Sequence, residues 1–238
     1  PLVIAGQGTI GVEILNELPG VDVIIVPIGG GGLIGGIAYV AKQLNPNIKV
    51  YGVQAKGAPS MLESIEHGHI ERLSAVSTIA DGIAVKEPGD LTYNLCQKYV
   101  DGIVTVSDDE VCAAILLLLE QHKMIAEGAG AVSVAAAMFC NLPLEGKKTV
   151  CVVSGGNIDV TTLNRIINRG LQKGGRLCTF SIEIDDKPGQ LVKISSLIAS
   201  LGANIISVLH ERTNTFINVN SCVLRVSIET RDQYHIDA

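Results

Sequence analysis

Short apolar runs typical of buried strands alternate, over the first two thirds of the chain, with segments whose apolar residues recur at helical spacing. The predicted strands are residues 21–28, 49–55, 101–107 and 148–155. The predicted helices are residues 33–44, 60–68, 108–124, 128–142 and 159–172. The third of these helices has Ser107 as its expected N-cap and Glu110 at the capping-box position. This alternation predicts right-handed βαβ units and a mostly parallel sheet, which is an α/β fold.

The pattern changes after a polar, glycine-bearing segment at residues 169–177. A strand, a helix and two longer strands with alternating apolar positions follow, at residues 178–184, 188–202, 203–213 and 218–230. This βαββ order with adjacent antiparallel strands indicates an α+β domain. The expected organisation is therefore a first domain over residues 1–168, a linker over 169–177 and a second domain over 178–238.

The second domain has the beginning of a ferredoxin-like unit, which also needs a second helix and a fourth strand. The pattern predicts only the start of a helix in the last residues, RDQYHIDA, so we expect this domain to be truncated. The chain opens with PLVIAGQG, without Met and without a basic region leading into an apolar segment. We expect no signal peptide, and the missing Met indicates a fragment or a processed chain.

Composition supports this interpretation and excludes several classes of function. Apolar residues make up 47% of the chain, aromatic residues only 3%, as in a parallel sheet buried on both faces. The longest uncharged stretch, residues 128–144, contains Asn and Pro and is too short for a bilayer span. A net charge of −6 without a basic stripe argues against nucleic acid. The six cysteines form no CxxC pair, which favours reduced thiols in a cytoplasmic protein over disulfides or a zinc site.

Two glycine-rich segments are candidate phosphate sites. The first, GQGTIG, places Gly6, Gly8 and Gly11 in the GxGxxG pattern of dinucleotide-binding proteins. That pattern needs a preceding strand and an acidic residue that closes the next strand. The preceding strand would be very short here, and Asp22 opens its strand instead of closing it. The sequence therefore does not favour NAD binding.

The second segment, residues 29–32, is four glycines between a convincing strand and a helix. Glycines there let several backbone N–H groups converge on an anion at a helix N-terminus. No Lys-Ser/Thr follows, so this is not a nucleotide P-loop, and close helix–strand packing is the alternative. A second strand end offers Ser154 before Gly155, Gly156 and Asn157. Because ligands bind at the carboxyl ends of parallel strands, the two segments suit a small cofactor with a phosphate at one end.

Five motifs in order, VPIGGGGLIGGIA, VYGVQA, TIADGIAV, AEGAGAVSVAA and VVSGGNID, resemble those of the pyridoxal-phosphate-dependent threonine dehydratases, also called threonine ammonia-lyases. The resemblance extends from residue 1 to about residue 167. It implies a tryptophan-synthase-β-like fold, PLP fold type II, of which part is present. It also implies β-elimination of L-threonine, with L-serine as a related substrate, to give 2-oxobutanoate and ammonia from threonine.

The resemblance also implies roles for individual residues. Ser154 would hydrogen-bond the pyridine nitrogen, Glu127 would lie beside the ring, and Gly155 and Asn157 would shape the ring pocket. The loop that binds the cofactor phosphate would consist of Gly29, Gly30, Gly31, Gly32 and Leu33. The alternative for Ser154 is an ordinary turn at a strand end.

The sequence departs from this family in one important respect. The family's Schiff-base lysine lies in a Ser-x-Lys-x-Arg-Gly-Ala motif upstream of the glycine loop, and no lysine here has those neighbours. We therefore expect no catalytic lysine in this chain and no turnover by the chain alone. Gln54 and Ser60 occupy the positions where serine-racemase relatives hold a divalent ion. Neither is a carboxylate, so we expect a weakly held monovalent ion or none.

The second domain resembles an ACT domain, a regulatory module that binds amino acids. Its D-x-P-G-x-L turn includes Asp186 and Gly189, and Asn204 is at a position where the family often contacts a ligand. This resemblance implies an amino-acid effector, isoleucine or valine, bound between paired domains of a dimer or tetramer. The alternative is that the Pro-Gly pair only starts a helix, Asn204 only caps a turn and the domain binds nothing.

Two other functions remain open from the sequence. Serine dehydratase or serine racemase shares the fold and some motifs, although the ACT domain disfavours both. A non-catalytic amino-acid sensor, with an ACT module attached to a lyase remnant, would explain the missing lysine. The sequence does not decide the effector, the preference for threonine or serine, the size of the oligomer or the origin of the truncation.

Overall fold

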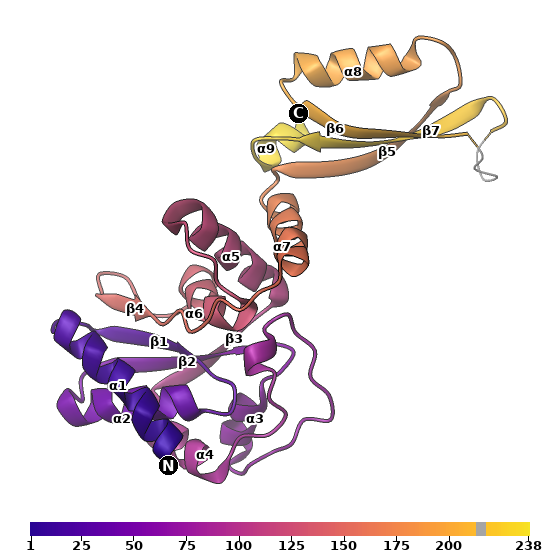
Figure 1. Ribbon diagram of the computed structural model, residues 1–238. Coiled ribbons are helices and arrows are strands. Elements are labelled where there is room, and N and C mark those ends of the chain that lie inside the picture. The colour runs from indigo at the N-terminus through magenta and orange to yellow at the C-terminus, as the bar shows by residue number, and fades with distance from the viewer. Residues whose placement is uncertain (213–217) are drawn as a thin grey trace. The chain divides into compact units, whose positions relative to one another are not determined.

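A computed structural model describes residues 1–212 and 218–238. The chain divides into two compact units, Pro1–Leu163 and Asn164–Ala238 (Figure 1). No helix among the described residues has both the length and the apolar character needed to cross a membrane. Residue 213, the last of the predicted strand over 203–213, lies outside the described residues.

The first unit contains a four-stranded sheet in the order β3-β2-β1-β4, and every neighbouring pair is parallel. Its strands are β1 (Val23–Pro27), β2 (Lys49–Ala55), β3 (Gly102–Val106) and β4 (Thr149–Cys151). The predicted parallel sheet is therefore confirmed, with β4 shorter than the sequence pattern indicates. All five residues of β1 are buried, as expected for a central strand covered on both faces.

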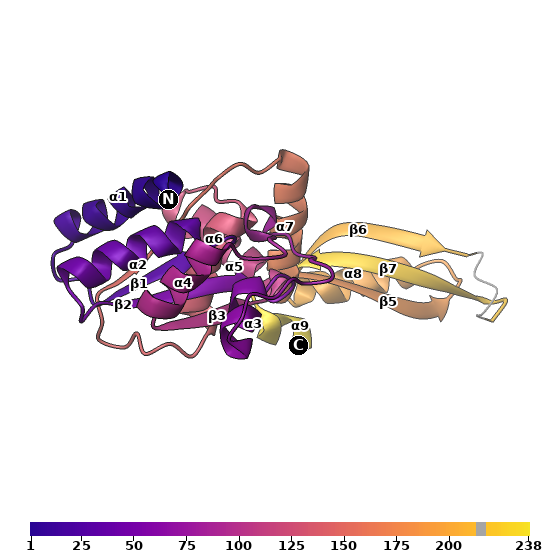
Figure 2. The ribbon, with the colours of Figure 1, turned by 90° about the horizontal axis from the view of Figure 1, so that it is seen from below.

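Helices cover both faces of this sheet (Figures 1 and 2). The helices are α1 (Leu2–Glu17), α2 (Gly32–Leu44), α3 (Ser60–His67), α4 (Asp90–Tyr99), α5 (Asp108–His122) and α6 (Gly128–Phe139), with a 3₁₀ turn η1 (Asp81–Ile83). Helix α6 packs against β1, β2 and β3, and α5 packs on α6. Helices α1 and α2 pack together, and α2 and α4 lie on the opposite face from α6 (Figure 1). This is a three-layer α/β arrangement whose core follows β1.

The GQGTIG segment lies inside α1, with no strand before it. Gly8 and Gly11 face α2, and a Cβ atom on Gly36 of α2 would collide with the Ile4 carbonyl oxygen and the Gly8 nitrogen. These glycines therefore allow two helix backbones to approach closely. They form no dinucleotide-binding loop.

The predicted N-terminus of α5 is confirmed in detail. The backbone N–H of Glu110 donates to Ser107 Oγ, and the backbone N–H of Ser107 donates to Glu110 Oε2 at 2.6 Å. This reciprocal capping box satisfies two N–H groups that have no partner within the helix. It fixes the start of α5 at the carboxyl end of β3.

The second unit contains an antiparallel sheet in the order β5-β7-β6. Its elements are β5 (Leu177–Asp185), α8 (Gln190–Ser200), β6 (Asn204–Glu211), β7 (Ser221–Glu229) and the short α9 (Gln233–Asp237). Ile194 and Ile198 of α8 pack on Leu224, Val226 and Ile228 of β7. The predicted βαββ order is confirmed. The described residues contain the start of a second helix and no fourth strand.

Helix α7 (Val160–Lys173) runs across the region where the sequence pattern places a domain boundary. The two compact units divide between Leu163 and Asn164, within this helix. Residues 169–173, at the start of the predicted linker, are helical, and Leu177 at its end already belongs to β5. The division of the chain at 168 and 177 stays a prediction.

Candidate functional site

The glycine-rich loop connects the carboxyl end of β1 to the N-terminus of α2. Gly31 is the N-cap of α2, with φ of 87°, and no side chain caps the helix. The N–H groups of the first helical turn therefore have neither an intrahelical partner nor a side-chain partner. The positive end of the helix dipole lies at the same place, which favours an anion there.

Two of these glycines are required by their surroundings. A Cβ atom on Gly31 would lie 2.7 Å from Met61 Cε and 2.9 Å from Thr92 Cβ, and its positive φ disfavours any other residue. A Cβ atom on Gly29 would lie 3.1 Å from the Ile83 Cα. Gly30 has no neighbour within 4 Å of such an atom, so its backbone borders open space.

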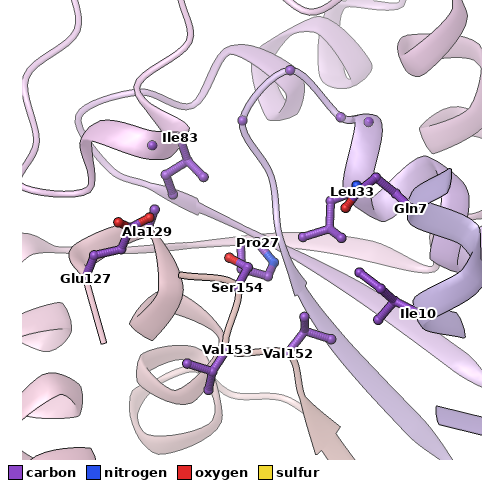
Figure 3. Close-up of a pocket in the computed structure, with 15 residues that line it drawn as sticks. Gln7, Ile10, Pro27, Leu33, Ile83, Glu127, Ala129, Val152, Val153 and Ser154 are labelled. Atoms are coloured by element: carbon purple, nitrogen blue, oxygen red, sulfur yellow. The ribbon is translucent and has the colours of Figure 1, made fainter. Parts of the chain in front are cut away.

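The loop forms one wall of a cavity of about 500 Å³. Figure 3 shows Leu33 and Gln7 on one side of this cavity, Glu127 and Ile83 on the other, and Ser154 between them. Ser154 follows β4, Glu127 is the N-cap of α6, and Ile83 belongs to η1. The carboxyl ends of β1 and β4 therefore meet at this cavity, as expected for a ligand site in a parallel sheet.

The segment after β4 is held against the N-terminus of α6. The Glu127 backbone N–H donates to the Gly155 carbonyl at 3.1 Å, and Glu127 Oε2 accepts from the Asn157 backbone N–H at 3.1 Å. A side chain on Gly155 would collide with the Glu127 carboxylate. A side chain on Gly130 would collide with the backbone of Gly155. These contacts fix the position of Glu127 at the cavity wall.

The structure brings most of the sequence-predicted cofactor residues to this cavity. Those that line it are Gly29, Gly30, Gly31, Gly32, Leu33, Glu127 and Ser154. Gly155 and Asn157 hydrogen-bond to Glu127 but do not line the cavity themselves. Their roles toward a cofactor stay predictions.

The remaining lining residues had no role predicted from the sequence. They are Gln7, Ile10, Pro27, Gly82, Ile83, Ala129, Val152 and Val153. The TIADGIAV motif was a usable signal for Gly82 and Ile83. Gln7 belongs to the segment considered as a dinucleotide loop, and only the packing of α1 on α2 brings it here.

Glu127 is the only charged side chain among the described residues that line this cavity. No lysine or arginine of the described chain is available there to pair with an anion. A phosphate would therefore be held by backbone N–H groups and the dipole of α2. The uncapped helix start and the side-chain-free loop fit such a group.

The two positions considered for a cation differ in their protein contacts. Gln54 is fully buried, and its Oε1 accepts from the Leu62 N–H at 2.9 Å while its Nε2 donates to the Ala58 carbonyl at 3.3 Å. Ser60 Oγ is buried and has no hydrogen-bond partner among the described residues.

The predicted effector residues are only partly brought together. Asp186 and Gly189 line a second cavity, of about 400 Å³, in the second unit. Asn204 lies at the other end of the sheet, because it pairs with Glu229 while Asp185 pairs with Ser221. The Asn204 side chain donates to Glu229 Oε2 at 3.1 Å.

The model of one family, described as "Pyridoxal-phosphate dependent enzyme", matches residues 1–156, which include the whole cavity. The chain belongs to this family. Its members depend on pyridoxal phosphate, so the cofactor expected from the sequence is confirmed at the level of the family.

Three relatives refine this assignment to the pyridoxal-phosphate-dependent enzymes. An L-threonine ammonia-lyase of Thermotoga maritima is 49% identical over 237 residues, 100% of this chain and 59% of the relative. The processed threonine deaminase isoform 2 of Solanum lycopersicum matches in structure with a TM-score of 0.66 at 40% identity, covering 70% of this chain and 49% of that one. Maize serine racemase matches with a TM-score of 0.64 at 38% identity, covering 68% and 52%. The chain thus spans between about half and three fifths of the length of these relatives.

Proposed function

We propose that this chain provides the cofactor cavity of an L-threonine ammonia-lyase, which converts L-threonine to 2-oxobutanoate and ammonia. One observation carries the proposal: the glycine loop, Glu127 and Ser154 meet at one cavity, in a chain 49% identical to an L-threonine ammonia-lyase. We propose L-serine as a second substrate, and a homo-oligomeric enzyme of the cytoplasm.

The glycine loop would hold the cofactor's phosphate. Backbone N–H groups of Gly29 to Leu33 surround the start of α2, where the helix dipole attracts negative charge. Pyridoxal phosphate, when bound, would supply an electron sink for the charge left at the substrate's α-carbon. No cation lines the cavity among the described residues, so backbone donors would carry the recognition of the phosphate.

Ser154 would determine how much of the negative charge at the substrate's α-carbon passes into the pyridine ring. Its hydroxyl can exchange a hydrogen bond with the pyridine nitrogen but does not hold that nitrogen protonated, as a carboxylate would. Less charge then enters the ring, and expulsion of the substrate's β-hydroxyl competes well with transamination. Glu127, fixed by the Asn157 N–H, would border the ring.

The lysine that carries the cofactor has no counterpart at this cavity. No lysine of the described residues lines it, and the chain spans 59% of the Thermotoga relative. We therefore propose the activity for the enzyme of which this chain is part, and we expect no turnover from residues 1–238 alone.

Measurement of 2-oxobutanoate formed from L-threonine by that enzyme tests the proposal. Ser154→Asp should keep the cofactor bound and lower the ratio of elimination to transamination by at least about tenfold, with pyridoxamine phosphate as the new product. Ser154→Thr, which keeps the hydroxyl, is the matched control and should retain elimination. An unchanged ratio in Ser154→Asp would remove Ser154 from the assigned role.

Serine racemization is a second candidate, favoured by the match to maize serine racemase. The same preparation should be incubated with L-serine and analysed for D-serine and pyruvate. Threonine deamination without D-serine supports the lyase. D-serine as the main product would replace it with a racemase.

We further propose that the second unit is an ACT domain that binds isoleucine or valine between two copies. The turn at Gly189 leaves the start of α8 without a side-chain cap, as the carboxylate of an amino acid requires, and Asp186 can accept from its ammonium group. Asn204 is at the far end of the same sheet, so it can join this site only from a second copy.

Calorimetry with isoleucine, valine and serine tests the regulatory site. Asn204→Ala should weaken binding by about 10- to 150-fold, the loss of one charge-assisted hydrogen bond of about 1.5–3 kcal/mol. Asn168→Ala, on α7, is the control and should bind like the wild type. Equal binding by Asn204→Ala would exclude Asn204, and no binding of any amino acid would leave a dimerisation element.

A further inference from the structure

A group of three potential metal ligands lies at the end of the sheet in the second unit. It consists of Asp186 after β5, His210 on β6 and Cys222 on β7, and their ligand atoms all lie within 4.8 Å of one another. The three residues line the cavity of about 400 Å³. They come from three separate segments of the chain, which is why the spacing of the cysteines gave no sign of them.

The register of the sheet explains how these side chains meet. His210 pairs with Leu224, and Cys222 lies two residues before Leu224 on the same strand. Side chains of paired residues, and of residues two apart, point to the same face of a sheet. Leu224 belongs to the apolar core under α8. His210 and Cys222 therefore continue the core face of the sheet with polar groups, where further apolar residues would be expected.

We propose that, in the chain without an amino-acid effector, Asp186, His210 and Cys222 bind a divalent transition-metal ion of the zinc type. Thiolate, imidazole and carboxylate are the ligands that such ions prefer, and the thiolate disfavours Mg²⁺ and Ca²⁺. Tetrahedral zinc ligands lie about 3.3–3.8 Å apart. His210 Nε2 and Asp186 Oδ1 are 3.9 Å apart, so small side-chain rotations would complete the site.

Burial and charge at the site suit a metal and also define a competitor for it. Cys222 is fully buried at the base of the cavity, while His210 and Asp186 are more exposed at its rim. Burial, and then the charge of Asp186, raises the pKa of the Cys222 thiol. The metal-free thiol is therefore protonated at neutral pH, and formation of the metal–sulfur bond releases that proton to solvent.

The Arg212 guanidinium lies 3.2 Å from Asp186 Oδ1 and competes with a metal for this carboxylate.

Titration of the metal-free full chain with Co²⁺ tests the proposal. We expect one Co²⁺ per chain, a cobalt–thiolate charge-transfer band in the near ultraviolet, and displacement by Zn²⁺ but not by Mg²⁺. Cys222→Ser should abolish the band, whereas Cys178→Ser, on β5 of the same sheet, should keep it. His210→Gln and Asp186→Asn should each weaken binding at least about tenfold, because loss of even an indirect partner costs about 10- to 100-fold.

Arg212→Gln distinguishes a metal site from an anion site. Removal of the competing cation should tighten Co²⁺ binding, whereas it would weaken binding of a ligand's carboxylate. His67 and His69 both contact Glu71 in the first unit, so His69→Gln is the control for binding to histidines elsewhere in the chain and should leave the band unchanged. Absence of the band in the wild type, or its persistence in Cys222→Ser, would overturn the proposal. Circular dichroism confirms that each variant is folded.

Discussion

Gly30 and Gly31 have different surroundings, although they are neighbours in one loop. Gly31 has a positive φ and no room for a side chain, so it determines the shape of the loop. Gly30 has open space around it and lines the cavity, so a side chain there would extend into the cavity without disturbing the loop.

Gly31→Ala should lower the free energy of unfolding by about 2–4 kcal/mol, the sum of a strained φ and a collision with Met61 and Thr92. Gly30→Ala, the matched control, should change it by no more than about 0.5 kcal/mol. Urea unfolding of both variants measures the difference. Equal losses in the two would show that the loop has another conformation.

Asp101 determines part of the acid sensitivity of the first unit. Burial opposes its ionisation, but hydrogen bonds from Lys42, the Val50 N–H and Lys49 outweigh burial and lower its pKa. Its carboxylate contacts Lys42 Nζ at 2.7 Å and the Val50 nitrogen at 2.8 Å. These contacts connect the start of β3 to β2 and α2.

A lowered pKa in the folded state means that the Asp101 carboxylate stabilises the fold above its unfolded-state pKa. That contribution is lost as the pH falls from 3.8 through the lower, folded-state value. Asp101→Asn should therefore be less stable than the wild type at neutral pH, and the difference should disappear in acid. Urea unfolding over a pH series measures it, and a constant difference at every pH would contradict this role.

Among the helices and strands, those with long periodic patterns could be predicted from the sequence, whereas a helix whose glycines pack closely against another helix could not. The strands β1, β2 and β3 and the capping box of α5 follow from local pattern. The helical conformation of α1 was missed because its glycines match a loop motif, and only their contact with α2 explains them. β4 ends at Cys151, earlier than its apolar pattern, and the next carbonyl, that of Val152, accepts from Ser133 Oγ of α6.

Gly35 and Gly36 of α2 offer a matched test of the α1–α2 contact. A Cβ atom on Gly36 would collide with the backbone of α1, whereas one on Gly35 would touch Leu95 at an ordinary 3.4 Å. Gly36→Ala should destabilise the unit by about 1–3 kcal/mol and Gly35→Ala should change it by less than about 1 kcal/mol.

Hydrogen exchange locates the effect of these two variants. Amides of α1 should exchange faster in Gly36→Ala, while those of β1 should stay protected. If Gly35→Ala gave the larger loss of protection in α1, the described helix contact would be wrong.

At the scale of the whole molecule, the chain combines a parallel α/β unit with an antiparallel α+β unit. The meeting of Gly29–Leu33 with Ser154 was predictable, because parallel strands bring their carboxyl ends to one edge. The presence of Gln7 at the cavity was not predictable, since it depends on the packing of α1 on α2. The separation of Asn204 from Asp186 follows from strand register, which the sequence does not reveal.

The proposed function depends above all on the glycine loop as the site that holds the phosphate of pyridoxal phosphate. Backbone amide NMR of this chain, titrated with pyridoxal phosphate and with pyridoxal, tests it most directly. We predict that the phosphate-bearing compound shifts the amides of residues 29–33 and that pyridoxal, which lacks the phosphate, leaves them nearly unchanged. Equal shifts with both compounds, or shifts confined to other residues, would show that the loop does not bind the phosphate.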